Sequence, residues 1–219
     1  MKGIILKDLY DNFRIGKNLA SYIFGGGFII LCALLFSAGV STQFSFGWLI
    51  MMTSTIFSSC TLESACEQDE KANFNRLLIS FPLSKTQIVL SRYLLTLCCI
   101  GAANLLTLLL TLYTVFFRHS FSLKMGFALW ALGLAISILF SGISIICYYL
   151  LGKKNGTIVY MILFFILAVV YNVFIVSLQS FGIITINWSF LLIISIPLSI
   201  VVFALSFLIS NWIFKRRYA

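Results

Sequence analysis

Charged side chains are scarce in this sequence, and acidic ones are the scarcest. Asp, Glu, Lys and Arg make up 10% of the 219 residues, and only six residues are acidic. Soluble domains average about 25% charged residues. Hydrophobic residues account for 61% of the chain, and its mean hydropathy is +1.08. This composition excludes an ordinary soluble domain.

Long uncharged runs fill most of the chain. Several reach the ~20 residues that a helix needs to cross the hydrocarbon core. They are continuously apolar rather than alternating, which disfavours a β-barrel. We therefore predict a single all-α integral membrane domain over residues 1–219 with six transmembrane helices. The predicted spans cover about residues 19–40, 46–62, 93–117, 125–151, 157–178 and 188–214.

Two further features complete the predicted topology. Ile5, Leu9 and Phe13 recur at a spacing of four, which predicts an amphipathic interfacial helix over residues 1–17. With both termini in the cytoplasm, every Lys and Arg except Arg118 and Lys124 falls in a cytoplasmic segment, as the positive-inside rule requires. The net charge of +9 is therefore interpreted as setting the orientation of the chain in the membrane, and not as a sign of nucleic-acid binding.

Groups that carry chemistry are missing from the predicted spans. Intramembrane enzymes, pumps and ion-coupled transporters need ionisable groups inside the bilayer, and no span has one near its middle. The single histidine, His119, falls in a predicted outer loop, and no HExxH, GxSxG or GxxxxGK[ST] pattern occurs. The six cysteines form no CxxC pair and are interpreted as free thiols. We therefore predict no catalytic residue, metal site or cofactor site in this chain, and no phosphate-binding loop.

The exception to this apolar pattern is a polar stretch from Glu63 to Arg92, with residues 63–85 predicted to be cytoplasmic. Four of the six acidic residues lie in it. Its apolar residues Phe74, Leu77, Leu78 and Phe81 share one helical stripe. Three carboxylates precede this stripe, where they suit a helix N-terminus; they belong to Glu67, Asp69 and Glu70.

A helix break and a new helix start follow this stripe. Pro82 ends the first helix. Ser84 can then cap a second helix with Gln87 at its third position, in the capping-box pattern S-x-x-Q that leads into the third span. Taken alone, these residues fit an ordinary interfacial helix between two spans.

The amino-acid sequence of this stretch resembles the signature of ABC-2 type permeases. These are the membrane subunits of bacterial ABC exporters whose ATPase is a separate chain. The resemblance rests on Asp69-Glu70-Lys71, on the aromatic Phe74, and on the run SFPLSKTQIVLSRYL over residues 80–94. Phe74 stands where the family often has Trp, and Lys85 stands where it has Arg. The N-terminal MKGIILKDLY and the six-span topology also resemble the family. Within it, the chain resembles permeases of the phenol-soluble modulin exporter type, and lantibiotic and bacitracin exporters carry very similar permeases.

The resemblance implies that the transport path and the ATP-binding site belong to different chains. It implies a coupling helix that contacts the ATPase subunit, with ATP and Mg²⁺ bound on that partner and no cofactor in this chain. It also implies a second permease chain, identical or paralogous, and a multi-pass location in the bacterial cell membrane. The implied ATPase interface comprises Glu67, Asp69, Glu70, Lys71, Phe74, Asn75 and Arg76. The implied hinge and start of span three comprise Pro82, Ser84, Lys85 and Gln87.

The implied function is ATP-driven export of a hydrophobic or amphipathic substrate, such as a phenol-soluble modulin or an antimicrobial peptide. Two amides near mid-span, Asn104 and Asn172, either bond across helices or line the substrate path. One alternative is an immunity or resistance protein that binds a peptide or antibiotic without exporting it. An intramembrane enzyme is disfavoured because no ionisable cluster exists to support it.

Overall fold

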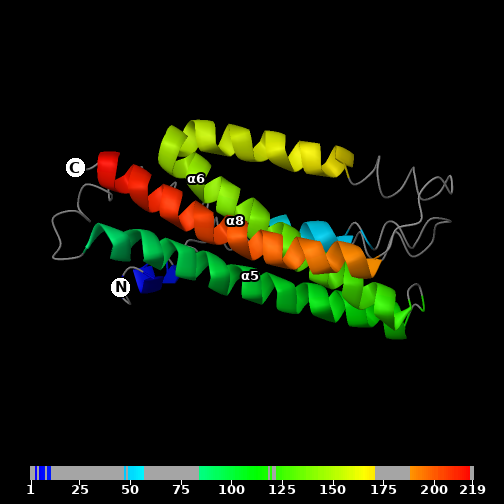
Figure 1. The fold of residues 1–219 in the computed structure, drawn as a ribbon. Coiled ribbons are helices and arrows are strands. Elements are labelled where there is room, and N and C mark those ends of the chain that lie inside the picture. Colours follow the sequence, from blue (N-terminus) through cyan, green and yellow to red (C-terminus); the bar gives the residue numbers. More distant parts are fainter. Residues whose placement is uncertain are drawn as a thin grey trace.

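The computed structural model describes residues 3, 5–7, 9–10, 47, 49–56, 84–117, 119, 122–170 and 188–217. All regular secondary structure in these ranges is α-helical. Three long helices dominate them (Figure 1). They are α5 (Lys85–Phe116), α6 (Leu123–Val170) and α8 (Trp188–Arg217).

Within the described ranges, three helical segments are long and apolar enough to cross a membrane, namely Lys85–Phe116, Leu123–Gly152 and Leu192–Arg216. They coincide with the predicted third, fourth and sixth spans. The shorter apolar helix Asn155–Val170 covers the described part of the predicted fifth span. Helical residues at 47 and 49–56 belong to the predicted second span. The predicted first span and residues 63–83 lie outside the described residues.

The ends of the helices gather into two groups (Figure 1). The first turn of α5, the bend of α6 and the last turn of α8 lie at one end, with the described N-terminal residues near them. This end carries Lys85, Lys215 and Arg216, and the Cζ atom of Arg216 lies 5.2 Å from the centre of the Trp212 ring. Lys124 lies in the first turn of α6, at the opposite end. This separation fits the predicted orientation, in which the basic end faces the cytoplasm.

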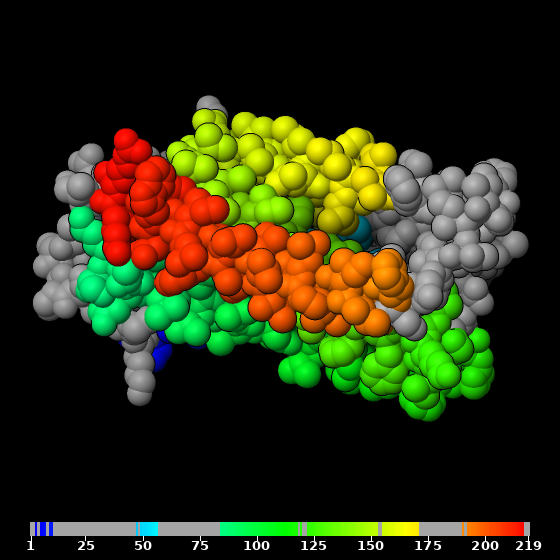
Figure 2. Space-filling view, in the orientation of Figure 1, coloured from blue at the N-terminus to red at the C-terminus, as the bar shows by residue number. Residues whose placement is uncertain are grey.

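Small polar side chains line the inside of the bundle, and large apolar ones cover its outside. Thr107 and Thr111 of α5 and Ser137 of α6 are buried, whereas Leu109 of α5 and Ile193 of α8 are 62% and 71% exposed. Figure 2 shows α8 lying across one face of the bundle. In lipid, small residues allow close helix packing, and apolar ones face the acyl chains.

The buried hydroxyls satisfy their hydrogen bonds mostly within their own helices. Thr96 donates to the Arg92 carbonyl at 2.9 Å, and Thr111 donates to the Thr107 carbonyl at 2.7 Å. Ser144 donates to the carbonyl of Phe140 at 2.8 Å. Such bonds to the preceding turn leave no unsatisfied donor in a site without water.

Two apolar clusters hold the described helices together. The first joins residues of α5, α6 and α8 at the basic end of the bundle; it comprises Ile88, Val89, Tyr93, Ile145, Tyr148 and Phe214. The second joins the helical segment 49–56 to the first part of α6; it comprises Leu49, Ile50, Met51, Leu129 and Leu132. Beside the second cluster, Ser54 Oγ donates to the Gly133 carbonyl at 3.1 Å.

The bend of α6 corrects one sequence-based interpretation. In the sequence, Gly152 and Gly156 enclose two lysines and Asn155, a pattern that predicts a tight basic turn with a glycine breaker at each side. The chain leaves helical geometry only at Gly152, where φ is 75° and ψ is −179°, a conformation that favours glycine. Gly156 lies inside the following helix and packs against Tyr148, so its missing side chain provides space and does not break the helix.

Replacing Gly156 by Ala should destabilise the bundle. A Cβ atom there would lie 2.6 Å from Cδ1 and 3.3 Å from Cα of Tyr148. We expect a loss of about 1–3 kcal/mol, as for other overpacked sites, measured as a lower Tm in detergent. Gly101→Ala is the control, because its Cβ would meet no atom within 4 Å. Equal Tm values for both variants would contradict the close packing at Gly156.

Candidate functional site: the start of α5 and its contacts with α6 and α8

The first turn of α5 carries a complete capping box. Ser84 has extended backbone angles, φ −69° and ψ 143°. Its Oγ accepts a hydrogen bond from the Gln87 backbone N–H at 3.3 Å, and its own N–H donates to Gln87 Oε1 at 3.2 Å. The predicted cap is therefore confirmed. It satisfies donors that the first helical turn would otherwise leave unpaired.

α5 continues from this cap as one helix of 32 residues. The predicted cytoplasmic start at Lys85 and the predicted span from residue 93 therefore belong to a single rod. Its first 16 residues, 85–100, contain neither Gly nor Pro, the residues at which sharp helix kinks most often occur.

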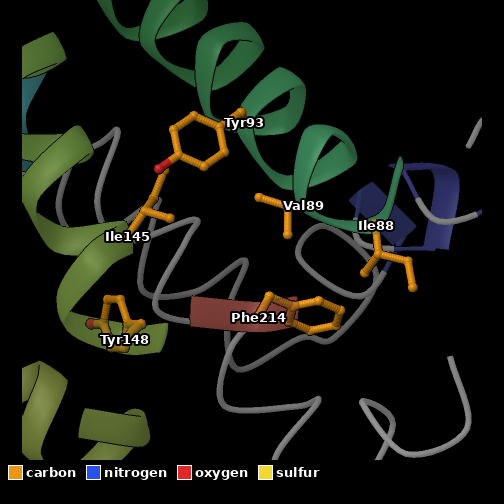
Figure 3. Packing of buried hydrophobic residues seen from close by; sticks show 6 residues of the cluster. All are labelled: Ile88, Val89, Tyr93, Ile145, Tyr148 and Phe214. Atoms are coloured by element: carbon orange, nitrogen blue, oxygen red, sulfur yellow. The ribbon is translucent and has the colours of Figure 1, made fainter. Parts of the chain in front are cut away.

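Apolar side chains fix this rod to the bundle within two turns of the cap. Ile88 and Val89 are 2% and 0% exposed. They belong to the cluster that includes Ile145 of α6 and Phe214 of α8 (Figure 3). Ser84 and Gln87 remain exposed. The start of α5 is thus accessible at its cap and buried directly after it.

Tyr93 of α5 makes both polar and aromatic contacts with α8. Its Oη lies 2.6 Å from Ser206 Oγ and 2.9 Å from Ser210 Oγ, both on α8. Its ring contacts Phe203 and Phe207 edge to face, with centroid distances of 5.1 Å and 5.3 Å. The side chain is 3% exposed, so these contacts form inside the bundle.

Asn104 lies between α5 and α6, farther along the same helix. Its Nδ2 donates to the Ile100 carbonyl at 2.9 Å and makes a long contact of 3.5 Å with Ser137 Oγ. Trp130 Nε1 donates to the Asn104 carbonyl at 3.0 Å. Asn104 is 4% exposed, and its Oδ1 accepts no hydrogen bond from the part of the chain that the structure describes. The predicted bond across helices is present but weak.

Comparison with protein families decides the class of the molecule. Residues 3–215 match the model of the ABC-2 family transporter protein, which covers almost the whole chain. The chain belongs to the ABC-2 transporter family. It is a multi-pass membrane permease without catalytic activity, and permeases of this family work with ATPase subunits. The comparisons with curated proteins and with solved structures returned no match.

The family match confirms the resemblance at the level of the permease and names no substrate. The likeness to phenol-soluble modulin exporters therefore stays a prediction. Within the described ranges, no group of three His, Cys, Asp or Glu side chains is arranged to hold a metal ion.

The structure brings together only part of the predicted site of this permease. Ser84, Lys85 and Gln87 share the first turn of α5. Asn104 lies 20 residues beyond Ser84 on the helix, or about 30 Å at the usual rise per residue. Other predicted site residues lie outside the described residues, namely Glu67, Asp69, Glu70, Lys71, Phe74, Asn75, Arg76, Pro82 and Asn172.

Sequence reasoning missed the contacts of Tyr93 and the burial of Arg92. Arg92 ends the polar stretch, yet its side chain is only 7% exposed, because this turn of α5 already lies against the bundle. A sequence signal for the Tyr93 contact exists on the permease's last helix. Ser206 and Ser210 are four residues apart, so they share one face of α8.

Removing the cap should loosen the first turn of α5. Ser84→Ala deletes the Oγ acceptor of the Gln87 N–H, which costs about 1 kcal/mol. We expect amides of residues 85–88 to exchange with deuterium about fivefold faster in the purified permease. Ser84→Asp retains an acceptor and should restore protection. Unchanged exchange in Ser84→Ala would show that the cap contributes nothing.

Replacing Asn104 by Leu separates its two predicted roles. Intramembrane side-chain hydrogen bonds average about 0.6 kcal/mol, and Oδ1 has no partner to lose. We therefore expect a change of less than about 1 kcal/mol in the unfolding free energy, measured by denaturation from mild detergent into SDS. Reduced transport at unchanged stability would support a place on the substrate path. A loss well above this range would contradict the weak cross-helix contact.

Proposed function

We propose that this permease exports hydrophobic or amphipathic molecules, driven by ATP and Mg²⁺ on a separate ATPase subunit. The single observation that carries the proposal is the continuity of α5 from its exposed cap into the bundle. If an ATPase displaced residues 63–83, this displacement would be passed on to the first turn of α5. Because Ile88 and Val89 are buried beside α6 and α8, that displacement would reach the other helices.

The nature of the spans supports an apolar or amphipathic substrate. Residues 93–116 of α5, 125–152 of α6 and 192–214 of α8 contain no Asp, Glu, Lys or Arg. A path for ions or strongly charged molecules needs compensating charges inside the membrane. Buried hydroxyls and apolar side chains instead suit a substrate that carries much of its own apolar surface, such as an amphipathic peptide.

The predicted coupling helix places the ATPase contact at Glu67–Arg76. Its charged and amide groups and Phe74 would contact the ATPase, and the rest of the apolar stripe would pack toward the spans. A second permease chain, identical or paralogous, would complete the transporter with two ATPase chains. This arrangement separates the chain that hydrolyses ATP from the chain that forms the path.

Charge reversal in the predicted coupling helix should uncouple the transporter. We expect Arg76→Glu combined with Phe74→Ala to lower ATPase stimulation and ATP-dependent uptake of a dansyl-labelled amphipathic peptide into inside-out vesicles, without lowering the amount of inserted permease. Lys215→Glu reverses a charge in the last turn of α8, at the end of the bundle where α5 begins, and should leave both activities unchanged.

Two results would contradict the proposal. Normal assembly and normal uptake by the doubly altered permease would show that residues 67–76 are not the ATPase contact. A wild-type permease that purifies in mild detergent without any ATPase chain would instead favour the binding protein without export.

A further inference from the structure

Tyr93 connects three helices through hydroxyl groups. Its Oη contacts Ser206 and Ser210 of α8, and Ser206 Oγ donates to the Gly142 carbonyl of α6 at 2.6 Å. Ser206 and Ser210 are 1% and 0% exposed. Figure 3 shows Tyr93 extending from α5 beside Ile145 of α6. These contacts lie inside the same apolar cluster that holds the start of α5.

The direction of each hydrogen bond follows from the number of protons. The Gly142 carbonyl can only accept, so Ser206 uses its single proton there. Ser206 must then accept from Tyr93, which uses its own single proton. Ser210 must therefore donate to Tyr93. We name the resulting series, Ser210 to Tyr93 to Ser206 to the Gly142 carbonyl, the hydroxyl chain.

The hydroxyl chain fixes how α5 and α8 move relative to one another. Apolar side chains slide past each other at little cost in lipid, because they face apolar surroundings in any register. The strength of a hydrogen bond in a medium of low dielectric constant, in contrast, depends on the relative position of its donor and acceptor. A shift of one helical turn, about 5.4 Å, would break the bonds between Tyr93 and α8.

The position of Tyr93 along α5 connects this contact to the cap. Tyr93 follows Ser84 by nine residues, or about 13 Å along the helix. No Gly or Pro interrupts the intervening turns. α8, in contrast, exposes most of its outer face, including Leu205 and Leu208 at 51% and 60%. Its inward hydroxyls therefore add directional contacts to the packing that sets its register.

We propose that Tyr93 is a positioning residue of the transport cycle. Its hydroxyl makes the part of α8 that follows Pro197 move together with α5. This inference rests on the proposed function, because it assigns a task to Tyr93 within ATP-driven movement. Tyr93 touches neither nucleotide nor the ATPase in this role. It acts by keeping two spans in one register while the first turn of α5 is displaced.

Tyr93→Phe tests the inference with the ring retained. The ring contacts with Phe203 and Phe207 persist, and only the hydroxyl is lost. Ser210→Ala removes the donor to Tyr93 alone and serves as a milder second variant. Ser199→Ala is the matched control on α8, because the buried Ser199 hydroxyl donates to the Ile196 carbonyl of its own helix at 2.7 Å.

The measurement is the distance between spin labels on α5 and α8. Labels at Leu90→Cys and Lys215→Cys, in a permease with its six native cysteines replaced by Ser, are compared by EPR in liposomes with the co-purified ATPase. Labelled permease is diluted with unlabelled chain. The two states are nucleotide-free and trapped with Mg-ATP and vanadate. The same samples give ATP hydrolysed per dansyl-peptide transported.

The wild type and Ser199→Ala should show one distance in both states. In Tyr93→Phe, the distance between the labels should equal the wild-type distance without nucleotide and differ from it in the trapped state. Transport per ATP should fall about three- to tenfold, as expected for losing one or two intramembrane hydrogen bonds. Ser210→Ala should show a smaller effect in the same direction. A merely structural role would alter the distance in both states alike and would not change transport per ATP.

Three results would overturn the inference. The first is a Tyr93→Phe permease with wild-type distances and wild-type transport per ATP. The second is an equal effect in Ser199→Ala, which would show that any lost hydroxyl suffices. The third is a wild-type complex without ATP-dependent transport, which contradicts the proposed function itself and with it any coupling role for Tyr93.

Discussion

Polar groups inside a membrane bundle must find hydrogen-bond partners within the protein, and the described helices are arranged around this requirement. Their buried Ser and Thr hydroxyls mostly return to a carbonyl one turn earlier, as Thr96 and Ser144 do. Because these side chains are short, neighbouring helices can approach one another closely. The large apolar side chains then face outward, where lipid replaces water as the solvent.

The same requirement makes the exceptions informative. Among the described residues, two serine hydroxyls donate to a backbone carbonyl of another helix at points where the backbones come close. Ser54 reaches the Gly133 carbonyl, and Ser206 reaches the Gly142 carbonyl. A Cβ at either glycine would lie 3.3–3.5 Å from atoms of the facing helix. Small residues therefore permit these contacts, and the hydrogen bonds then specify the register that apolar packing alone leaves open.

Local features of this permease were predictable from the sequence, and contacts between helices were not. Span positions follow from hydropathy, and the cap at Ser84 follows from residues three apart. Gly156 had the signature of a helix breaker, but its role depends on where the bend at Gly152 directs the next helix. The contact of Tyr93 with Ser206 joins residues 113 positions apart. No local pattern specifies which faces of two apolar helices meet, so this part of the site required the fold.

Differences in stiffness among the three spans give the hydroxyl chain its place in a mechanism. The first 16 residues of α5 contain neither Gly nor Pro, whereas α8 contains Pro197 and α6 bends at Gly152. Proline removes a backbone hydrogen bond and weakens a helix locally. Ser206 and Ser210 lie on the C-terminal side of Pro197, toward the cap of α5. A movement of α5 that is transmitted through Tyr93 would therefore reach only the part of α8 that follows Pro197. The part of α8 that precedes Pro197 could then move separately, with the proline as the point of division. A path that opens at one membrane face while closing at the other needs such a division within a single span.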